Sequence, residues 1–331
     1  MFKSIVTELR LIKGVFLKSN KFLKSRENVS FKNLYNFIIL RYFYIRPFFR
    51  FLVKGKKISG PKKITDDYLQ LNLDIEKIIN DLKSNAGYST GYNINQNVID
   101  QIIDHYTSDK KNIETDTQLK NFLNDNNLET ENLIKKNDED FETYIQRIIE
   151  MGTHQIRFAD KDLDQNSVMS KLIRSEPLIK LAQNYLNSKN ISIINEMVIS
   201  LPTKKNIKID VLKQSSQTFH RDLVSKNFFK AFVFLSDINN NDGSHVYLEG
   251  SHKKNFNDET NKNDLSIEAL YKDYKKKEIS GKKGDLFFGD TFCLHKGSNP
   301  KNNYRLLLIL TFFTGTSLQT QNKKNITQIN I

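Results

Sequence analysis

The sequence FHRDLVSKNFFKAFVFL, residues 219–235, decides the fold class of this chain of 331 residues. Its second half, Phe228 to Leu235, is an aromatic and β-branched run that is typical of a buried strand. Its first half contains His220 and Asp222, which are separated by one residue. Strand side chains alternate between two faces, so this spacing on a strand directs both polar side chains to one face.

A second histidine and an arginine extend this pair into a candidate metal site. His295 lies far along the chain from Asp222, and Arg305 follows it. Two imidazoles and one carboxylate form the ligand set of the non-haem Fe(II) facial triad, which leaves open positions for reactants. Arg305 suits a carboxylate-bearing cosubstrate, because a guanidinium can bind a carboxylate through two hydrogen bonds. We therefore predict that His220, Asp222 and His295 bind a metal.

Further short strands surround the opening stretch. Residues 239–243 read Asn-Asn-Asn-Asp-Gly and predict a turn, because these residue types tolerate positive φ. Strand candidates lie at residues 191–201, 244–248, 284–291 and 304–313. Several short strands separated by turns favour a β-sandwich or a barrel.

From about residue 191 to residue 313 the chain resembles the phytanoyl-CoA dioxygenase family of 2-oxoglutarate-dependent oxygenases. The resemblance depends on the order and spacing of several motifs. These are His220-Arg-Asp222, the strand 231–238 with its Leu-Ser-Asp ending, Asp242-Gly-Ser244 leading to Gly250-Ser-His-Lys253, Gly284-Asp-Leu286, and His295-x-Gly297 with Arg305. The family's fold is a double-stranded β-helix, the jelly roll of cupins. We therefore expect a mainly β fold with helical elaboration (α+β).

The resemblance also implies roles for the site residues. His220, Asp222 and His295 would hold Fe(II), and Arg305 would bind the distal carboxylate of 2-oxoglutarate. The reaction would consume O2 and 2-oxoglutarate, release succinate and CO2, and hydroxylate a small organic substrate or a carrier- or lipid-linked one. Related halogenases replace the carboxylate ligand with a small residue. Asp222 therefore favours hydroxylation, although desaturation or epimerisation would use the same ligands.

Two positions depart from the family pattern. Glu249 stands where the family usually has Pro before Gly-Ser-His. The chain has no Trp, so Phe232 would take the place of an aromatic residue, often Trp, that lines the cosubstrate site in some members. Neither change removes a metal ligand. Cys293 is interpreted as a small buried apolar residue. The remaining histidines are interpreted as structural residues; they are His105, His154, His245 and His252.

Other functions stay open at this point. A zinc hydrolase can also use two histidines and a carboxylate, but the chain lacks an H-E-x-x-H signature, and hydrolysis does not explain Arg305. A non-catalytic jelly-roll binding protein could keep the pocket, although it need not retain all four site residues. A membrane-associated oxygenase of lipid or surface-glycan modification is compatible with the main prediction.

The cysteine content and the distribution of apolar residues indicate the cellular compartment. The single Cys excludes an internal disulfide and suits a reducing compartment, which predicts a cytoplasmic protein. No run reaches the roughly 18 apolar residues of a transmembrane helix. The first apolar stretch contains Glu8 and Arg10 and lacks the features of a signal peptide.

Basic residues concentrate in the N-terminal fifth. Residues 1–63 contain 16 Lys and Arg against 2 Asp and Glu, whereas the remainder contains 35 and 36, so the net charge of +13 arises entirely in this part. Residues 31–57 combine aromatic side chains with Arg41, Arg46, Arg50 and a lysine cluster. Such a segment could make peripheral contact with an anionic membrane, or it could be a helical extension packed on the barrel. No nucleic-acid recognition motif accompanies it, so we expect no nucleic-acid partner.

We predict four parts along the chain. They are a basic aromatic N-terminal extension (1–64), a helical region (65–150), a double-stranded β-helix oxygenase domain (151–316) and a polar C-terminal tail (317–331). Apolar pairs at helical spacing predict helices near residues 73–79, 98–103 and 139–149, and Ser175 with Pro177 predicts the start of another. Residues 86–92 are expected to form a loop.

Overall fold

The computed structural model describes residues 63–83, 86–109, 112–114, 117–159, 164, 166–202, 209–225, 227–253, 263–315 and 326–329. The N-terminal extension up to residue 62, with its predicted membrane segment 31–57, lies outside the described residues. The helices and strands are β1 (Lys63–Asp66), β2 (Leu71–Asp74), α4 (Ile75–Lys83), β3 (Tyr88–Asn93), α5 (Gln96–Thr107), α6 (Thr117–Asp125), η2 (Thr130–Leu133), α7 (Phe141–Met151), β4 (Gln155–Phe158), α8 (Val168–Ile173), α9 (Glu176–Leu186), β5 (Ile191–Ser200), α10 (Ile209–Gln214), β6 (Phe228–Phe234), β7 (His245–Leu248), η3 (Ser251–Lys253), α11 (Asp264–Leu270), β8 (Lys276–Ile279), β9 (Asp285–Gly289), β10 (His295–Gly297), β11 (Arg305–Phe313) and β12 (Ile326–Ile329).

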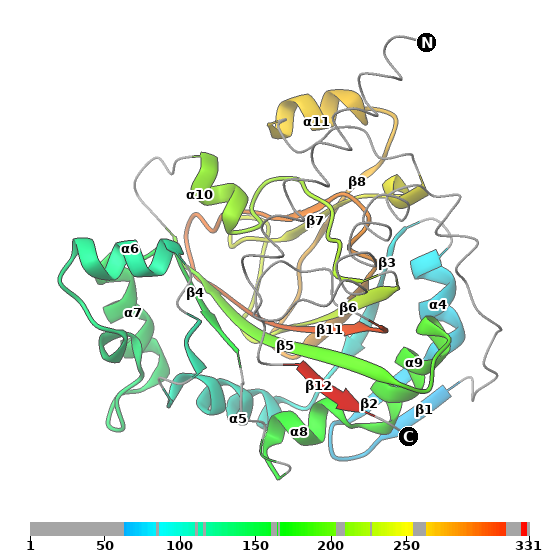
Figure 1. Cartoon of the computed structure of the whole chain (residues 1–331), viewed down its shortest axis with the longest axis horizontal. Helices are drawn as coiled ribbons and strands as arrows, with labels where there is room; N and C mark the ends of the chain where they lie inside the picture. Colours follow the sequence, from blue (N-terminus) through cyan, green and yellow to red (C-terminus); the bar gives the residue numbers. More distant parts are fainter. Residues whose placement is uncertain are drawn as a thin grey trace, which may run out of the picture.

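The main sheet contains seven strands among the described residues. Their order is β12-β5-β11-β6-β9-β3, and β4 also pairs with β5. All of these pairs are antiparallel. One edge of β5 pairs with β11, and the other edge is shared by β4 near one end and β12 near the other. Figure 1 shows β5 and β11 running side by side through the middle of the molecule.

A smaller sheet, β10-β7-β8, lies on one side of the main sheet. His220 joins it through a single antiparallel bridge to His295. Successive elements alternate between the sheets: β5 is in the main sheet, His220 in the small one, β6 in the main one, β7 and β8 in the small one, β9 in the main one, β10 in the small one and β11 in the main one. This order is that of a double-stranded β-helix, so the predicted jelly roll is confirmed.

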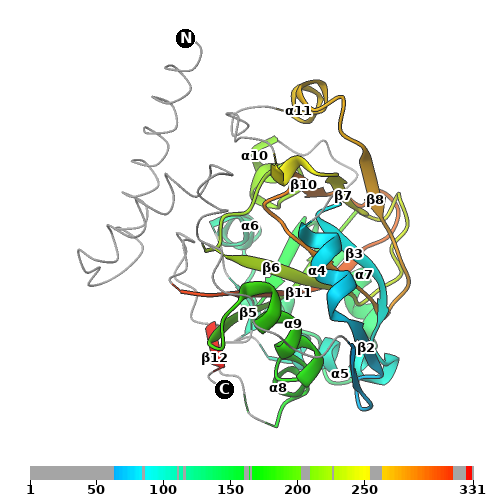
Figure 2. The same cartoon turned by 90° about the vertical axis from the view of Figure 1, so that its right-hand side faces the viewer.

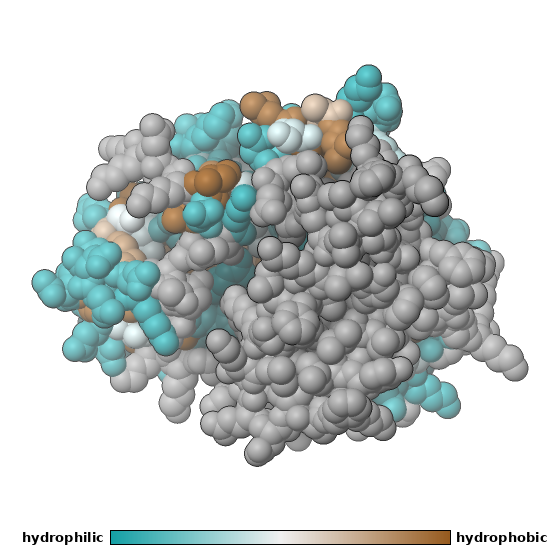
Figure 3. Space-filling view, turned by 45° about the horizontal axis from the view of Figure 1, so that its top comes forward, coloured by the Kyte–Doolittle hydropathy of each residue, from teal (hydrophilic) through white to brown (hydrophobic). Residues whose placement is uncertain are grey.

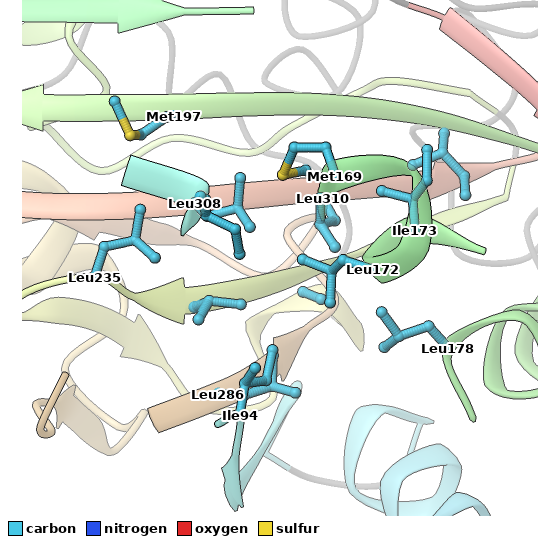
Figure 4. Close-up of a cluster of buried hydrophobic side chains, with 14 of the residues drawn as sticks. Ile94, Met169, Leu172, Ile173, Leu178, Met197, Leu235, Leu286, Leu308 and Leu310 are labelled. Atoms are coloured by element: carbon cyan, nitrogen blue, oxygen red, sulfur yellow. The ribbon is translucent and has the colours of Figure 1, made fainter. Parts of the chain in front are cut away.

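Helices cover the opposite side of the main sheet. Figures 1 and 2 show α5, α8 and α9 on one side of β5 and β11, with β7 and β8 on the other. Alternation along β11 separates two hydrophobic clusters: Leu308 and Leu310 belong to the cluster shared with the helices, and Leu307 belongs to the one between the sheets. In Figure 4, Leu308 and Leu310 lie close to Met169 and Leu172 of α8. The face with Leu307 is therefore left to form the site.

The predicted helices are present, and local capping explains their limits. α7 begins after Asp140, whose carboxylate accepts a hydrogen bond from the backbone N–H of Thr143 at 2.7 Å, and it ends at Gly152 with φ +84°. α9 begins after Ser175 with Pro177 in its first turn. The Ser175 side chain makes no capping hydrogen bond, so the start of α9 rests on Pro177 and on the packing of its apolar side chains.

Three local expectations differ from the structure. Residues 86–92, expected as a loop, include most of β3, which pairs with β9 at an edge of the main sheet. Part of the tail expected at 317–331 forms β12 on the edge of β5. Pairing with distant backbone explains both strands, and sequence patterns do not reveal such pairing. His220 makes only a one-residue bridge, and Asp222 follows in irregular backbone rather than on a strand.

Within the described residues, none of the helices combines the length and apolar character needed to cross a membrane. Large hydrophobic side chains are exposed on α10 and α11, at Ile209, Leu265 and Leu270. The face in Figure 3 shows small hydrophobic patches among hydrophilic surface in its coloured part.

Candidate metal and cosubstrate site

The structure brings His220, Asp222 and His295 together in one pocket between the two sheets. One nitrogen or oxygen of each residue lies within 4.8 Å of the others. The Asp222 carboxylate lies 3.7 Å from His220 Nε2 and 3.6 Å from His295 Nε2. Ligand bonds of about 2.0–2.2 Å require donor atoms at roughly this spacing. The three side chains therefore fit a single metal ion.

Backbone contacts hold the two imidazoles in position. His220 Nδ1 lies 2.9 Å from the carbonyl oxygen of Thr218, and His295 Nδ1 lies 2.9 Å from that of Cys293. Donation from each Nδ1–H leaves Nε2 with its lone pair directed away from the backbone, as metal-binding histidines require. The His220 and His295 backbones also exchange two hydrogen bonds, of 3.0 and 3.1 Å. The bridge thus fixes the distance between the two rings.

A lysine accompanies the carboxylate ligand. Lys230 Nζ lies 2.7 Å from Asp222 Oδ2, and the lysine side chain is only 12% exposed. Lys230 is on β6, where alternation places it on the pocket side with Phe232. Lys230 was not among the predicted site residues, although a single charge within the apolar run 228–235 was a visible signal. Lys230 holds one oxygen of Asp222, so it orients the carboxylate.

The electrostatic environment keeps Asp222 and His295 in the protonation states that metal ligands need. Burial opposes ionisation of Asp222, but Lys230, His295 and His220 outweigh it and hold the pKa of the carboxyl well below its usual range. Burial and the neighbouring His220 lower the pKa of His295 to about 3. Metal binding requires an ionised carboxylate and a neutral imidazole, so Asp222 and His295 are in the required states at neutral pH.

Arg305 lines the same pocket and is 5% exposed. Its Nη1–H donates to the carbonyl oxygen of Gly243 at 2.8 Å, and its Nη2–H donates to Ser200 Oγ at 3.1 Å. Among the described residues, it has no carboxylate partner, and its Nε is buried without a hydrogen bond. Burial and nearby Arg157 lower the pKa of Arg305 to about 10, so it stays charged at neutral pH. A buried cation of this kind fits an anionic ligand.

Glycines make room for Arg305. A Cβ at position 297 would overlap the Arg305 guanidinium, and Gly243 has φ +91°, a conformation that favours glycine. Gly297 belongs to the His295-x-Gly297 motif, and Gly243 ends the predicted turn 239–243. Both motifs therefore have a physical explanation in the packing of the arginine.

The rest of the pocket is apolar on one side and polar on the other. Phe232, Leu307 and Ile309 form the apolar part. Phe232, predicted to lie in the cosubstrate site, lines the pocket and stacks on Phe287, with ring centroids 4.6 Å apart. The polar part comes from strands β4 and β5 and their surroundings; its residues are Gln155, Arg157, Glu196, Ser215 and Ser216. None of these polar residues was predicted from the sequence to belong to the site.

One departure from the family pattern, Glu249, and the buried Cys293 both have side-chain contacts in the structure. Glu249 Oε1 accepts a hydrogen bond from Tyr88 Oη at 2.5 Å, which connects the Gly-Ser-His loop to β3. Cys293 is buried, and its Sγ lies 3.1 Å from both Ser251 Oγ and the Leu248 carbonyl oxygen. Burial raises the pKa of the Cys293 thiol, which agrees with an unreactive residue.

The four remaining histidines differ in their surroundings. His105 lies outside the pocket, edge-on to Tyr106. Burial lowers the pKa of His154, and His252 belongs to η3 and is buried. His245, interpreted from the sequence as structural, instead lines the pocket. The other three do not line it.

Comparisons with known proteins support no closer assignment. No protein-family model matches the chain, and no curated protein is significantly similar to it. Among solved structures, it is similar to AviO1 from Streptomyces viridochromogenes Tue57 (14% identity, 74% of this chain and 97% of that one, TM-score 0.45). It is also similar to EctD from S. alaskensis with bound Fe (12%, 79% and 84%, 0.45) and to SnoN, a non-haem alpha-ketoglutarate-dependent epimerase from nogalamycin biosynthesis (14%, 73% and 84%, 0.43). The strand pairing of this chain establishes its fold, and its own side-chain geometry defines the candidate site.

Proposed function

We propose that this protein is an Fe(II)- and 2-oxoglutarate-dependent dioxygenase. One observation carries the proposal: two histidine Nε2 atoms and an aspartate converge in a pocket that also contains a buried arginine without an acidic partner among the described residues. A metal alone would explain the triad, but it would leave Arg305 without a role. A dicarboxylate cosubstrate explains both.

Each residue of the candidate site would have its own role. His220, Asp222 and His295 would hold the iron, and Arg305 would bind the far carboxylate of 2-oxoglutarate through a charge-assisted hydrogen bond from its free Nε–H. Lys230 would keep Asp222 oriented. When bound, Fe(II) would supply the activation of O2 that side chains cannot provide. The apolar side of the pocket would exclude water from the reacting groups.

The reaction class follows from the ligand set. With Asp222 present, no position is vacated for a halide, so we propose hydroxylation of an organic substrate with release of succinate and CO2. We further propose that the chain is related to the phytanoyl-CoA dioxygenase family. The support is the series of motifs from His220 to Arg305, and in particular the packing reason found for Gly243 and Gly297. The substrate would be small, or carrier- or lipid-linked.

Succinate formation tests the proposal directly. The full-length protein would be loaded with Fe(II) without oxygen, then given 2-oxoglutarate, O2 and a library of metabolites. We expect slow 2-oxoglutarate-dependent succinate release that a true substrate accelerates. His220→Ala should abolish it and should weaken metal binding beyond the 10- to 100-fold loss typical of outer-shell changes, because a ligand itself is removed. His105→Ala, a change outside the pocket, serves as the matched control.

Two results would contradict the proposal. Metal and 2-oxoglutarate binding without succinate from any candidate would favour a non-catalytic jelly-roll binding protein. Zinc-dependent hydrolysis without 2-oxoglutarate binding would favour the hydrolase alternative.

We also propose that the enzyme acts in the cytoplasm and makes peripheral contact with membranes through residues 31–57. The support is the charge distribution of the sequence, in which the N-terminal fifth contains the entire positive excess. This contact would bring a lipid-linked substrate close to the enzyme, and it is compatible with lipid or surface-glycan modification. We propose that the protein has no nucleic-acid partner.

A further inference from the structure

His245 is a buried polar side chain that the proposed chemistry has not yet used. It is the first residue of β7 and is only 6% exposed. Neither of its ring nitrogens has a hydrogen-bond partner among the described residues. An imidazole has at least one N–H donor in every protonation state. Leaving a buried donor unsatisfied is costly, and His245 also lines the candidate pocket, so a ligand bound there would supply the missing acceptor.

The position of His245 narrows the identity of that ligand. On one side, its ring stacks on His295, with centroids 5.4 Å apart and planes within 8°. Along the small sheet, His245 pairs directly with Gly297, the residue over which the Arg305 guanidinium packs. His245 therefore stands between a metal ligand and Arg305. A 2-oxoglutarate molecule that reaches from the metal to Arg305 would extend past this imidazole.

His245 and Arg305 both line this pocket, and each has a buried N–H donor without a hydrogen-bond partner among the described residues. One belongs to His245, and the other is the Nε–H of Arg305, whose Nη atoms already donate to Gly243 and Ser200. The apolar lining of the pocket includes Phe232, whose ring centroid is 4.8 Å from that of His245. Two such donors and an apolar side chain in the lining of one pocket suit the two oxygens of one carboxylate.

We propose that His245 is a specificity-determining residue that donates a hydrogen bond to the distal carboxylate of 2-oxoglutarate, together with Arg305. This inference rests on the proposed function and deepens it. It makes the site selective for a 2-oxo diacid, because a 2-oxo monoacid would leave both donors without an acceptor. The sequence pattern did not reveal this role, since a histidine at the start of an ordinary strand has no distinctive spacing.

The test compares two ligands on two variants. His245→Phe keeps the aromatic stacking on His295 but removes the donor, and His245→Gln restores an N–H. Each protein would be loaded with Ni(II), which does not support O2 chemistry, and titrated calorimetrically with 2-oxoglutarate or with 2-oxopentanoate, which lacks the distal carboxylate. Thermal unfolding and Ni(II) titration would show that each variant is folded and binds the metal.

We expect His245→Phe to bind 2-oxoglutarate about 10- to 100-fold more weakly than the unchanged protein, as loss of a hydrogen bond to a charged group predicts. Binding of 2-oxopentanoate should stay within about twofold, and His245→Gln should recover part of the loss. Equal weakening of both ligands, or no weakening, would overturn the assignment of His245. If the unchanged protein binds Ni(II) but not 2-oxoglutarate, the proposed function itself fails, which is a distinguishable result.

Discussion

At the scale of single residues, the charge of Lys230 affects both the stability of the pocket and its affinity for a metal. Its ammonium group lies 2.7 Å from Asp222 Oδ2, where a bound metal would compete with it for the same carboxylate. The pair is largely buried, and breaking a buried pair leaves an uncompensated charge. Lys230 therefore orients the Asp222 carboxylate and stabilises the metal-free pocket, while its positive charge lowers the affinity of the pocket for a metal cation.

We predict opposite effects of Lys230→Met in the two states. Without metal, the variant should lose about 3 kcal/mol of unfolding free energy, because Asp222 loses its partner. With Ni(II), the stabilisation on binding should exceed that of the unchanged protein. Thermal unfolding with and without Ni(II) measures both effects. Lys283→Met, which removes the partner of Asp100 outside the pocket, is the control. An unchanged response to Ni(II) would show that Lys230 does not compete with the metal.

Arg305 allows a second prediction at this scale. Removing the guanidinium leaves the distal carboxylate of the cosubstrate without its charged partner, at a cost of about 2–5 kcal/mol. Arg305→Ala should therefore raise the concentration of 2-oxoglutarate needed for half-maximal succinate release by more than tenfold. The affinity for Ni(II) should change little, since Arg305 contacts none of the three ligands through a hydrogen bond. An unchanged requirement for 2-oxoglutarate would make Arg305 a structural residue.

At the scale of elements, α7 is anchored by an ion pair. Arg147 on this helix forms a two-point pair with Glu139, with Nε–Oε1 and Nη2–Oε2 distances of 2.7 and 2.8 Å. Its Nη2–H also donates to the carbonyl oxygen of Ile134 at 2.7 Å. The pair thus ties α7 to the preceding segment. The hydrogen bond from Arg147 lowers the pKa of Glu139 from 4.5 to about 2.

This shift predicts a pH dependence of stability. A lowered pKa in the folded state contributes stability above the unfolded value near 4.5, and that contribution is lost as the pH falls toward 2. Glu139→Gln should lower the free energy of unfolding by about 1–3 kcal/mol at pH 7, and the difference from the unchanged protein should shrink at pH 3. Urea unfolding at both pH values measures it. Glu150→Gln, an exposed change on the same helix, should have little effect at either pH.

At the scale of the whole molecule, the N-terminal extension is strongly basic, whereas the net charge of the rest of the chain is close to zero. We predict that the full-length protein sediments with vesicles containing anionic lipid at low salt, since each basic residue near such a surface contributes about 1 kcal/mol. Added salt should release it, because surface attraction is screened. A chain that begins at residue 63 should remain in the supernatant. Retention of the full-length protein in the supernatant at low salt would assign residues 31–57 a structural role.

The sequence by itself determined the strands β5, β6, β7, β9 and β11 of the jelly roll and the chemical types at its site. Alternating and apolar runs such as 228–235 and 304–313 predict strands because local side-chain patterns match local burial. His220, Asp222, His295 and Arg305 could be named because their types and order already indicate a metal and a carboxylate.

Only the tertiary structure decided which other residues join them. Lys230 and His245 lie on ordinary strands, and their importance comes from facing the pocket across the fold. β3 and β12 became strands because the edges of β9 and β5 offered unpaired backbone groups, a long-range effect that local propensity does not contain. Contacts between distant segments depend on how two sheets close around one pocket, and that closure is a property of the whole chain.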